Sequence, residues 1–560
     1  MFKHRAERTK PNVPGRPAWP GRLLTALVAV LAAGSTTAQF TDVTVHDPSI
    51  VKVDDTYYIF GSHLAAARST DLVHWTRFAE GVNPGNPLFV NPVTELQDLF
   101  DWSGTVGLWA NDVRQLDDGR FYMYPNLSAN TEPRASLSLA IADDIEGPYT
   151  YQEIFLQSGM WGEISEDGEN IYEPRDHPNT IDPHVFYDRS GELWMVYGSY
   201  SGGIFIMRMD PVTGLPAPGQ GYGKHLWGGN HARIEGPFML YSWDTGYYYL
   251  FVTFGGLDAV GGYNMRVARS RRPDGPFLDA LGNDMAEVKS DPSLPLFDDE
   301  SIEPFGQKLM GNFRFRRKDG EPGAGSGHGY VSPGHNSAIY EPALDKYFLV
   351  FHTRFPNQGE FHQVRVHEFF LNADGWPVVA PHRYLPESGP GSLGFGAGDA
   401  SLTSFPPRKG LADPWEQGAC VRAMHCKPAP ARSAAELAGD YKFINHGKAI
   451  SAAIVESTLL VLNADGSLGG AHTGRWASQP GERLVLDLDE VGLFQGVVSR
   501  GWNETADQYV MTFTAQSVEG ISVWGSRIEY EGGESNNQPS AAGVTRPTPA
   551  VLGHKRLKQQ

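Results

Sequence analysis

The sequence predicts an all-β protein: a five-bladed β-propeller followed by a small antiparallel β-barrel or sandwich domain. A unit made of a short apolar strand, an Asp- or Gly-containing turn and an aromatic-rich strand recurs five times at uneven spacings. Heptads and long segments with a 3.6-residue period do not occur between the copies,. A β-sandwich would also give many short strands, but it would not repeat the same unit so often. Five stacked copies therefore favour a propeller.

The five units begin at matching positions, which are Asp47, Asp112, Asp182, Glu235 and His335. Asp47 and Asp182 precede proline, and Glu235 precedes Gly-Pro. Radial stacking places matching positions around one axis, so we expect these carboxylates to converge on one pocket. Two converging carboxylic acids can cleave a glycosidic bond, one as a general acid and the other by activating water. For an isolated acid the preferred interpretation is structural, because carboxylates at strand starts commonly accept turn N–H groups.

The ends of the chain lie outside the predicted fold. Residues 1–38 combine a basic stretch, the apolar run Leu23 to Ala33 and small residues suited to cleavage. We interpret them as a secretory signal peptide, with an uncleaved N-terminal anchor as the alternative, so the catalytic part is expected to be secreted. The propeller is expected over 42–385, a connection over 386–435, the second β domain over 436–530 and a disordered tail over 531–560.

The formal net charge of −19 disfavours nucleic acid or an anionic membrane as a partner, whereas a neutral glycan tolerates such a surface,. We expect a monomer with no membrane contact after signal cleavage. The two cysteines, Cys420 and Cys426, are as consistent with a disulfide as with free thiols,. Asn126 and Asn503 stand in N-glycosylation sequons, which matter only in a host that glycosylates,.

Five motifs together resemble glycoside hydrolase family 43 and, within it, the two-domain endo-α-1,5-L-arabinanases, from about Val45 to Ile528. They are His46-Asp47-Pro48-Ser49, Asn179-Thr180-Ile181-Asp182-Pro183, Tyr197-Gly198-Ser199-Tyr200-Ser201-Gly202-Gly203, Arg233-Ile234-Glu235-Gly236-Pro237 and Gly334-His335-Asn336-Ser337. The resemblance implies a secreted, inverting hydrolase of internal arabinan bonds, with the polysaccharide as its partner. An exo-acting arabinofuranosidase or β-xylosidase of the same family, and a non-catalytic glycan-binding propeller, remain the alternatives.

The resemblance also implies roles for the acids. Asp47 would be the general base, Glu235 the general acid, and Asp182 the third carboxylate that orients the acid and raises its pKa. A like charge nearby does disfavour ionisation, which is the physical reason for that division. Inversion leaves room for a water, so the carboxyls of Asp47 and Glu235 should lie roughly 6.5 to 9.5 Å apart.

According to the resemblance, His335 would be a ligand of one calcium ion, and water molecules would complete the coordination shell of that ion. From the residues alone a hydrogen-bonded core histidine is preferred, because calcium favours oxygen ligands. The expected substrate contacts are Asp47, Trp109, Asn179, Thr180, Ile181, Asp182, Ser199, Tyr200, Ser201 and Arg354. Each of Asn179, Ser199, Ser201, Trp109 and Arg354 could equally be structural. The second unit has Asn111 where many relatives have proline, which leaves the local loop shape open.

Overall fold

The computed structural model describes residues 39–129, 131–387 and 430–530. The predicted signal peptide, the tail, Cys420, Cys426 and most of the predicted connection lie outside these ranges. Within them, no helix is long and apolar enough to cross a membrane. Helices are short: α1 (Pro92–Glu95), α2 (Gln97–Ser103) and α4 (Ala434–Leu437), with the 3-10 turns η1 (Ser62–Leu64) and η2 (Met285–Glu287).

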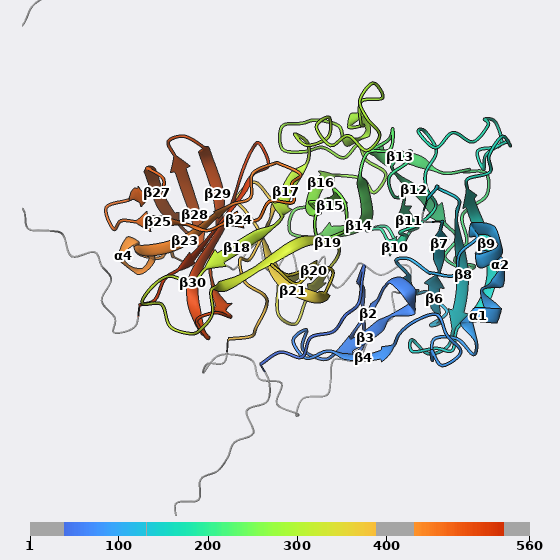
Figure 1. Ribbon diagram of the computed structural model, residues 1–560, viewed down its shortest axis with the longest axis horizontal. Helices are drawn as coiled ribbons and strands as arrows, with labels where there is room; N and C mark the ends of the chain where they lie inside the picture. The colour runs from blue at the N-terminus through green and yellow to red at the C-terminus, as the bar shows by residue number, and fades with distance from the viewer. Residues whose placement is uncertain (1–38, 130, 388–429, 531–560) are drawn as a thin grey trace, which may run out of the picture. The chain divides into compact units, whose positions relative to one another are not determined.

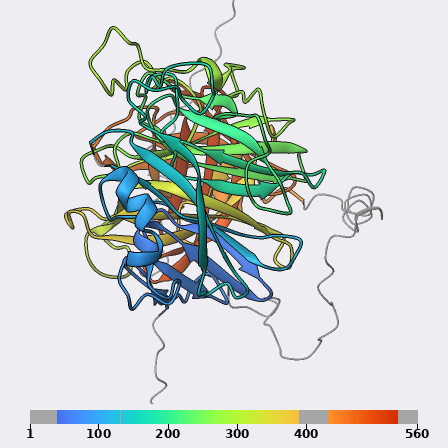
Figure 2. The ribbon, with the colours of Figure 1, turned by 90° about the vertical axis from the view of Figure 1, so that its right-hand side faces the viewer.

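Five antiparallel sheets form the five-bladed propeller predicted from the repeat (Figures 1 and 2). Blade 1 contains β1 (Ser49–Val53), β2 (Thr56–Phe60), β3 (Ala66–Ser69) and β4 (Thr76–Ala79). Blade 2 contains β5 (Asp112–Gln115), β6 (Phe121–Tyr124), β7 (Asn126–Ser128), β8 (Ala135–Ala142) and β9 (Thr150–Ser158). Blade 3 contains β10 (His184–Tyr187), β11 (Leu193–Tyr197), β12 (Ile204–Met209) and β13 (Lys224–Trp227).

Blade 4 contains β14 (Ile234–Ser242), β15 (Tyr247–Phe254), β16 (Asn264–Ser270) and β17 (Gln307–Met310). Blade 5 contains β18 (Phe313–Arg316), β19 (Gly327–Glu341), β20 (Lys346–Arg354), β21 (His362–Leu371) and β22 (Pro377–Val379). Each blade begins at one of the five predicted unit starts, except that β18 adds a strand before the fifth. The uneven spacing of the repeat reflects insertions such as the one between β16 and β17.

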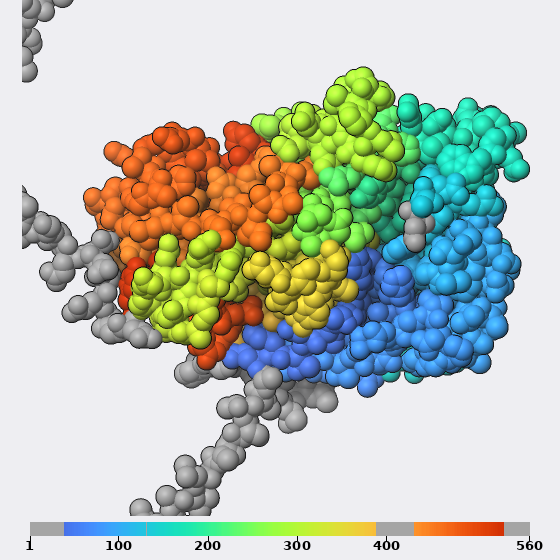
Figure 3. Space-filling view, viewed as in Figure 1, coloured from blue at the N-terminus to red at the C-terminus, as the bar shows by residue number. Residues whose placement is uncertain are grey.

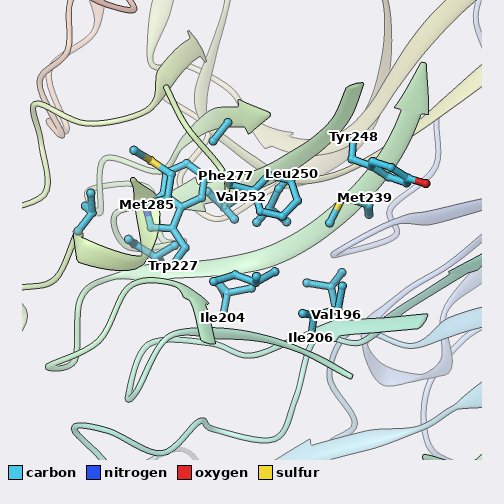
Figure 4. Close-up of a cluster of buried hydrophobic side chains, with 14 of the residues drawn as sticks. Val196, Ile204, Ile206, Trp227, Met239, Tyr248, Leu250, Val252, Phe277 and Met285 are labelled. Atoms are coloured by element: carbon cyan, nitrogen blue, oxygen red, sulfur yellow. The ribbon is translucent and has the colours of Figure 1, made fainter. Parts of the chain in front are cut away.

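Apolar side chains from neighbouring blades interlock, and this packing holds the blades around their axis. Between blades 3 and 4, Val196 and Ile206 belong to the same buried cluster as Leu250 and Val252 (Figure 4). Trp227 also belongs to this cluster and is fully buried. Both faces of these strands are covered, so their sequences are almost continuously apolar instead of alternating with polar residues.

Asp112, whose role the sequence left open, connects three blades. Its carboxylate accepts hydrogen bonds from Ser49 Oγ of blade 1 at 2.5 Å and from the backbone N–H of Val185 in blade 3 at 2.7 Å. Asp112 is 3% exposed. A buried carboxylate is tolerated when such donors satisfy it, so this position in the repeat is structural.

The C-terminal domain is a closed barrel, which decides between the barrel and the sandwich. Its strands are β23 (Gly439–Asn445), β25 (Thr458–Leu462), β26 (Ser467–Gly470), β27 (Gly474–Gln479), β28 (Arg483–Leu488), β29 (Gly492–Asn503), β30 (Gln508–Ser517) and β31 (Ser522–Arg527). Closure comes from antiparallel pairing of the first strand with the last, from Tyr441 with Arg527 to Asn445 with Val523.

The hairpin of β18 and β19 joins the propeller to the barrel. β18 pairs in parallel with β24 (Val455–Glu456) of the C-terminal domain, and the surface of this hairpin adjoins the barrel in Figure 3. At the hairpin turn Glu321 forms an ion pair with Lys442 of β23, and both side chains are fully buried. Asn503 also donates to Glu321, at 3.1 Å.

Both predicted glycosylation sequons are inaccessible in the fold. Asn126 and Asn503 are each 0% exposed. The side-chain nitrogen of Asn126 donates to the carbonyl of Ala110 at 2.5 Å, and that of Asn503 donates to Glu321. A glycan on either nitrogen would break these buried hydrogen bonds, so neither sequon is accessible in the folded protein.

Candidate active site

The predicted acids lie where the inner strands of the blades begin. Asp47 lies two residues before the start of β1, Asp182 lies two residues before β10, and Glu235 is the second residue of β14. Asp47, Asp182 and His335 adopt left-handed backbone conformations, with φ of 55°, 56° and 46°. Such conformations are unfavourable for residues other than glycine and concentrate at functional sites.

Asp47 is surrounded by histidines and a hydroxyl. His46 Nδ1 lies 2.8 Å from Asp47 Oδ2, and Ser62 Oγ donates to the same oxygen at 2.5 Å. His335 Nδ1 lies 3.1 Å from Oδ1, and the backbone N–H of Asp47 donates to His352 Nδ1 at 3.1 Å. The carboxylate is 6% exposed. Burial raises the pKa of Asp47, but the charges of His335 and His46 outweigh it and hold the pKa well below its usual value,.

Glu235 is buried and held by two hydroxyls. Tyr263 donates to Oε1 at 2.6 Å and Ser199 donates to Oε2 at 2.8 Å. Burial raises the pKa of Glu235 above its ordinary value, although His335 and both hydroxyls act in the opposite direction,. The carboxyl of Glu235 therefore keeps its proton up to a higher pH than the carboxyl of an exposed glutamate does.

Asp182 is linked to Glu235 through the backbone. Its Oδ2 accepts the N–H of Gly236, the residue after Glu235, at 3.3 Å. Burial raises the pKa of Asp182 to about 8, with His335 opposing and the charge of Glu235 adding to the increase. The two carboxyls interact, so they titrate as a pair that retains a proton near neutral pH.

His335 completes the group from blade 5. Its backbone N–H donates to Thr253 Oγ1 at 2.8 Å. Burial lowers the pKa of the imidazole, but the neighbouring carboxylates of Asp47 and Asp182 raise it to about 9 overall. In the absence of another cation, a protonated His335 thus balances part of the negative charge.

A small cavity of about 10 Å³, here called the axial cavity because all five blades contribute to its lining, lies beside these side chains. Asp47, Asp182, His335, Asn111 and Asn336 contribute to its lining. Both side-chain polar atoms of Asn336, and Oδ1 of Asn111, are buried without a hydrogen-bond partner among the described residues. Such a volume fits one water-sized species. Unpaired amide and carboxylate oxygens are the donors that calcium prefers, so the residues fit the ion expected from the sequence.

A second cluster with metal-ligand geometry is formed by His46, Asp47 and His352. His352 Nδ1 already accepts the backbone N–H of Asp47. This nitrogen has no free lone pair for a metal, so the asparagine-lined cavity suits a cation better.

Several predicted substrate contacts lie around the acids. Ser199 bonds Glu235 directly, and the N–H of Tyr200 donates to the carbonyl of Ile234 at 2.9 Å. The carbonyl of Ser201 accepts the N–H of His231 at 2.9 Å. Tyr200 and Ser201 have φ of 51° and 38°, so this loop is held in an unusual conformation beside the acid.

The segment before Asp182 is packed into the fold. Asn179 accepts a hydrogen bond from Ser128 Oγ at 3.3 Å. Thr180 is 0% exposed and its hydroxyl lies 3.2 Å from Ser158 Oγ, while the carbonyl of Ile181 accepts the N–H of Gly198 at 2.9 Å. These contacts give Thr180 and Ile181 a role in holding the position of Asp182.

Trp109 and Arg354 also have structural contacts. Trp109 is half-buried, and its indole N–H donates to the carbonyl of Ser128 at 3.1 Å. Arg354 Nε donates to Glu360 at 2.6 Å, and the Arg354 side chain is 4% exposed. Trp109 keeps part of its ring accessible, and Arg354 Nη1 is buried without a hydrogen-bond partner among the described residues, so a contact with sugar stays a prediction for both.

Sequence reasoning missed Ser62, Tyr263 and His352 as parts of the site. Ser62 lies in the turn after β2, and Tyr263 lies in the loop before β16, so no shared motif marks them. His46 stands directly before Asp47, and His352 stands two residues before Arg354. The position of His46 next to the predicted base Asp47 was the one sequence feature that could have marked a histidine as part of the site.

Comparison with protein-family models matches residues 40–297 to "Glycosyl hydrolases family 43" and residues 425–525 to a "C-terminal lipocalin-like domain". A protein of Bacillus subtilis named "Extracellular endo-alpha-(1->5)-L-arabinanase 2" is 46% identical over 87% of this chain and 94% of its own length. A protein of Thermotoga petrophila named "Extracellular endo-alpha-(1->5)-L-arabinanase" is 43% identical over the same shares.

Solved structures agree with the whole two-domain arrangement. A family 43 glycoside hydrolase from Bacillus licheniformis is 49% identical with a TM-score of 0.77, over 87% of this chain and 99% of that one. An endo-1,5-α-L-arabinanase from Thermotoga petrophila is 43% identical with a TM-score of 0.76, over 88% of this chain and 99% of that one. The similarity therefore covers propeller and barrel together.

Proposed function

The chain belongs to family 43 of the glycosyl hydrolases, and we propose that it cleaves internal α-1,5-L-arabinofuranosidic bonds of arabinan outside the cell. The observation that carries this proposal is that Asp47, Asp182 and Glu235 come together from three blades, with Asp47 against His335 and Asp182 bonded to the N–H of Gly236, the residue after Glu235. In this arrangement the pKa of Asp47 is lowered and that of Glu235 is raised. Two carboxyl groups that are driven apart in this way divide into a base and an acid.

In the proposed reaction Glu235 gives its proton to the glycosidic oxygen as the bond to the anomeric carbon breaks. Asp47 takes a proton from a water, whose oxygen attacks the anomeric carbon from the opposite face. The products are an alcohol on the leaving chain and a hemiacetal of inverted configuration. Exchange with solvent then returns a proton to Glu235 and removes one from Asp47.

Asp182 holds the acid in place. Its hydrogen bond from the N–H of Gly236 fixes the backbone beside Glu235. Its carboxyl interacts with that of Glu235, and burial raises the pKa of Asp182 to about 8, so the two groups share a proton near neutral pH,. That a charge on Asp182 raises the pKa of Glu235 stays a prediction.

We also propose that one calcium ion binds at the axial cavity through His335, Asn111, Asn336 and the flanking carboxylates, with waters completing its shell. The unpaired amide atoms of the two asparagines support this choice. When bound, the ion supplies positive charge next to the carboxylates and takes over the charge balance from the proton on His335.

The proposal is tested by following hydrolysis of linear α-1,5-arabinan with proton NMR. The wild-type chain should release hemiacetals whose anomeric signals first appear in the inverted configuration. Retained configuration would contradict the division of roles. Asp47→Ala should lose hydrolysis while it still binds arabinan; if the wild-type chain bound arabinan without hydrolysis, a non-catalytic glycan-binding propeller would be favoured. Light scattering of the same sample checks the expected monomer.

A further inference from the structure

A large cavity opens at the end of the propeller channel opposite the acids. Its volume is about 1240 Å³. Residues late in the inner strands line it, including Lys52 of β1, Arg114 of β5 and Tyr241 of β14. The acids lie where the inner strands begin, so this cavity and the acids occupy different mouths of the channel. His184 and Phe238 line both this cavity and the small axial cavity, and so lie between the two mouths.

Basic side chains outnumber acidic ones in the cavity. The charged residues of the lining are Lys52, Arg114, Arg189, Arg483, Asp188 and Asp244. The acids already have donors: Asp188 accepts from Trp194 Nε1 at 3.2 Å, and Asp244 accepts from Tyr347 at 2.7 Å. Of the bases, Lys52 is paired with Glu341 at 2.6 Å. Positive charge here is notable in a chain with a formal net charge of −19.

Arg114 is the least exposed of the three remaining bases, since Arg189 and Arg483 are exposed. Its guanidinium lies 5.4 Å from the centre of the Tyr187 ring. Among the described residues, it has neither a hydrogen bond nor an ion pair. Arg114 is half-buried, and burial lowers the pKa of its guanidinium. A guanidinium presents five donors in a planar fork that matches a carboxylate, so a half-buried one without protein acceptors favours an anionic ligand.

Besides the basic side chains, the cavity has aromatic side chains of the kind that bind sugar rings. Trp243 lines the cavity and is 45% exposed, with its ring set perpendicular to Tyr241 at 4.9 Å. The contact with Tyr241 fixes the orientation of the Trp243 indole, and part of the indole faces solvent. Aromatic rings that combine an apolar face with a fixed orientation suit the apolar face of a sugar ring.

We propose that this cavity binds carboxylate-bearing sugar units, that is, the uronic acid residues of an acidic polysaccharide. Arg114 accepts the carboxylate in a bidentate contact, Arg189 and Arg483 at the rim attract the polyanion, and Trp243 stacks on a ring. The volume exceeds what one small ligand needs, so it admits an oligosaccharide. The site is independent of hydrolysis, and it would retain the enzyme on an acidic polymer while neutral arabinan reaches the other mouth.

The test is isothermal titration of the full chain with a galacturonic acid trimer at low salt. The wild-type chain should bind it, and binding should persist when excess arabino-oligosaccharide occupies the catalytic mouth. Arg114→Met should weaken binding about tenfold or more, since it removes a charge-assisted bidentate contact. The matched control is Arg475→Met, an exposed barrel arginine outside the cavity, which should bind as the wild type does. Hydrolysis of neutral arabinan should be unchanged in both.

Three results would overturn the proposal: no binding by the wild-type chain, equal binding by Arg114→Met, or displacement by the arabino-oligosaccharide. A carboxyl-reduced trimer should fail to bind; binding as strong as the acidic form would remove the role of the carboxylate. Dextran sulfate that binds as well and depends equally on Arg114 would show a general anion site instead of a uronate site. If Arg114→Met does not fold, Trp243→Ala on the cavity rim makes the same prediction.

Discussion

The hydroxyl of Tyr263 donates a 2.6 Å hydrogen bond to Oε1 of Glu235. Tyr263 lies in the loop before β16 and Glu235 lies at the start of β14, so this hydrogen bond connects two separate segments of blade 4. The phenol is fully buried, and it stabilises the ionised form of the carboxyl that is proposed to act as the acid. This contact limits how far burial can raise the pKa of Glu235.

Tyr263→Phe should therefore move the alkaline limb of the pH profile of kcat/KM to higher pH. Removal of the donor leaves the carboxylate of Glu235 less stabilised, so the proton is lost later as the pH rises. The shape of the side chain is kept, which separates this effect from a packing defect. A limb that stays in place would show that Glu235 does not set it.

The acidic limb should lie well below pH 6. The pKa of Asp47 is lowered, so this base stays ionised as the pH falls. The enzyme loses activity only at the low pH at which Asp47 becomes protonated. Combined with the raised pKa of Glu235, this gives a bell-shaped profile. An acidic limb at or above pH 6, measured on arabinan over a range of buffers, would contradict the assignment of Asp47 as the base.

Glu235→Gln should lose roughly 10²- to 10⁴-fold in kcat on arabinan, the usual contribution of a general acid. The loss should be much smaller on a 4-nitrophenyl arabinofuranoside that the wild type accepts, because a good leaving group needs little protonation. Equal losses on both substrates would argue against an acid role. Asp47→Ala is the matched control, since loss of the base should impair both substrates alike.

Removal of calcium should lower the rate. A chelator is expected to reduce hydrolysis, and added calcium to restore it, because the ion balances the charge of the buried carboxylates. Asn336→Leu should weaken calcium binding in titrations of the apo protein, which is a readout separate from activity. An anomalous-scattering map of the calcium-loaded crystal without a peak at the axial cavity would remove this proposal.

Lys442→Met should destabilise the protein by about 3–5 kcal/mol in the free energy of unfolding, since it leaves Glu321 as an uncompensated buried charge,. The double variant with Glu321→Gln should recover much of this loss, because neither charge then remains. Calorimetric unfolding checks both. A double variant as unstable as the single one would show that packing and not charge dominates at this contact.

The repeat made the propeller and its five unit starts predictable, and with them the site residues Asp47, Asp182, Glu235 and His335, because local motifs carry that information. Ser62 and Tyr263 were not predictable, since they reach the acids from loops whose course depends on the tertiary fold. Closure of the barrel rests on β23 pairing with β31, about eighty residues apart in the sequence, and a strand pattern cannot reveal such a contact,. The burial of Asn126 and Asn503 was invisible for the same reason.

The central claim is that the enzyme cuts inside the arabinan chain, and the products formed in the first few per cent of hydrolysis of linear α-1,5-arabinan test it most directly. Chromatography of timed samples should show arabino-oligosaccharides of mixed length before arabinose accumulates, together with an early fall in viscosity. Arabinose as the only early product, with viscosity falling in proportion to hydrolysis, would contradict the claim and favour an exo-acting enzyme of the same family.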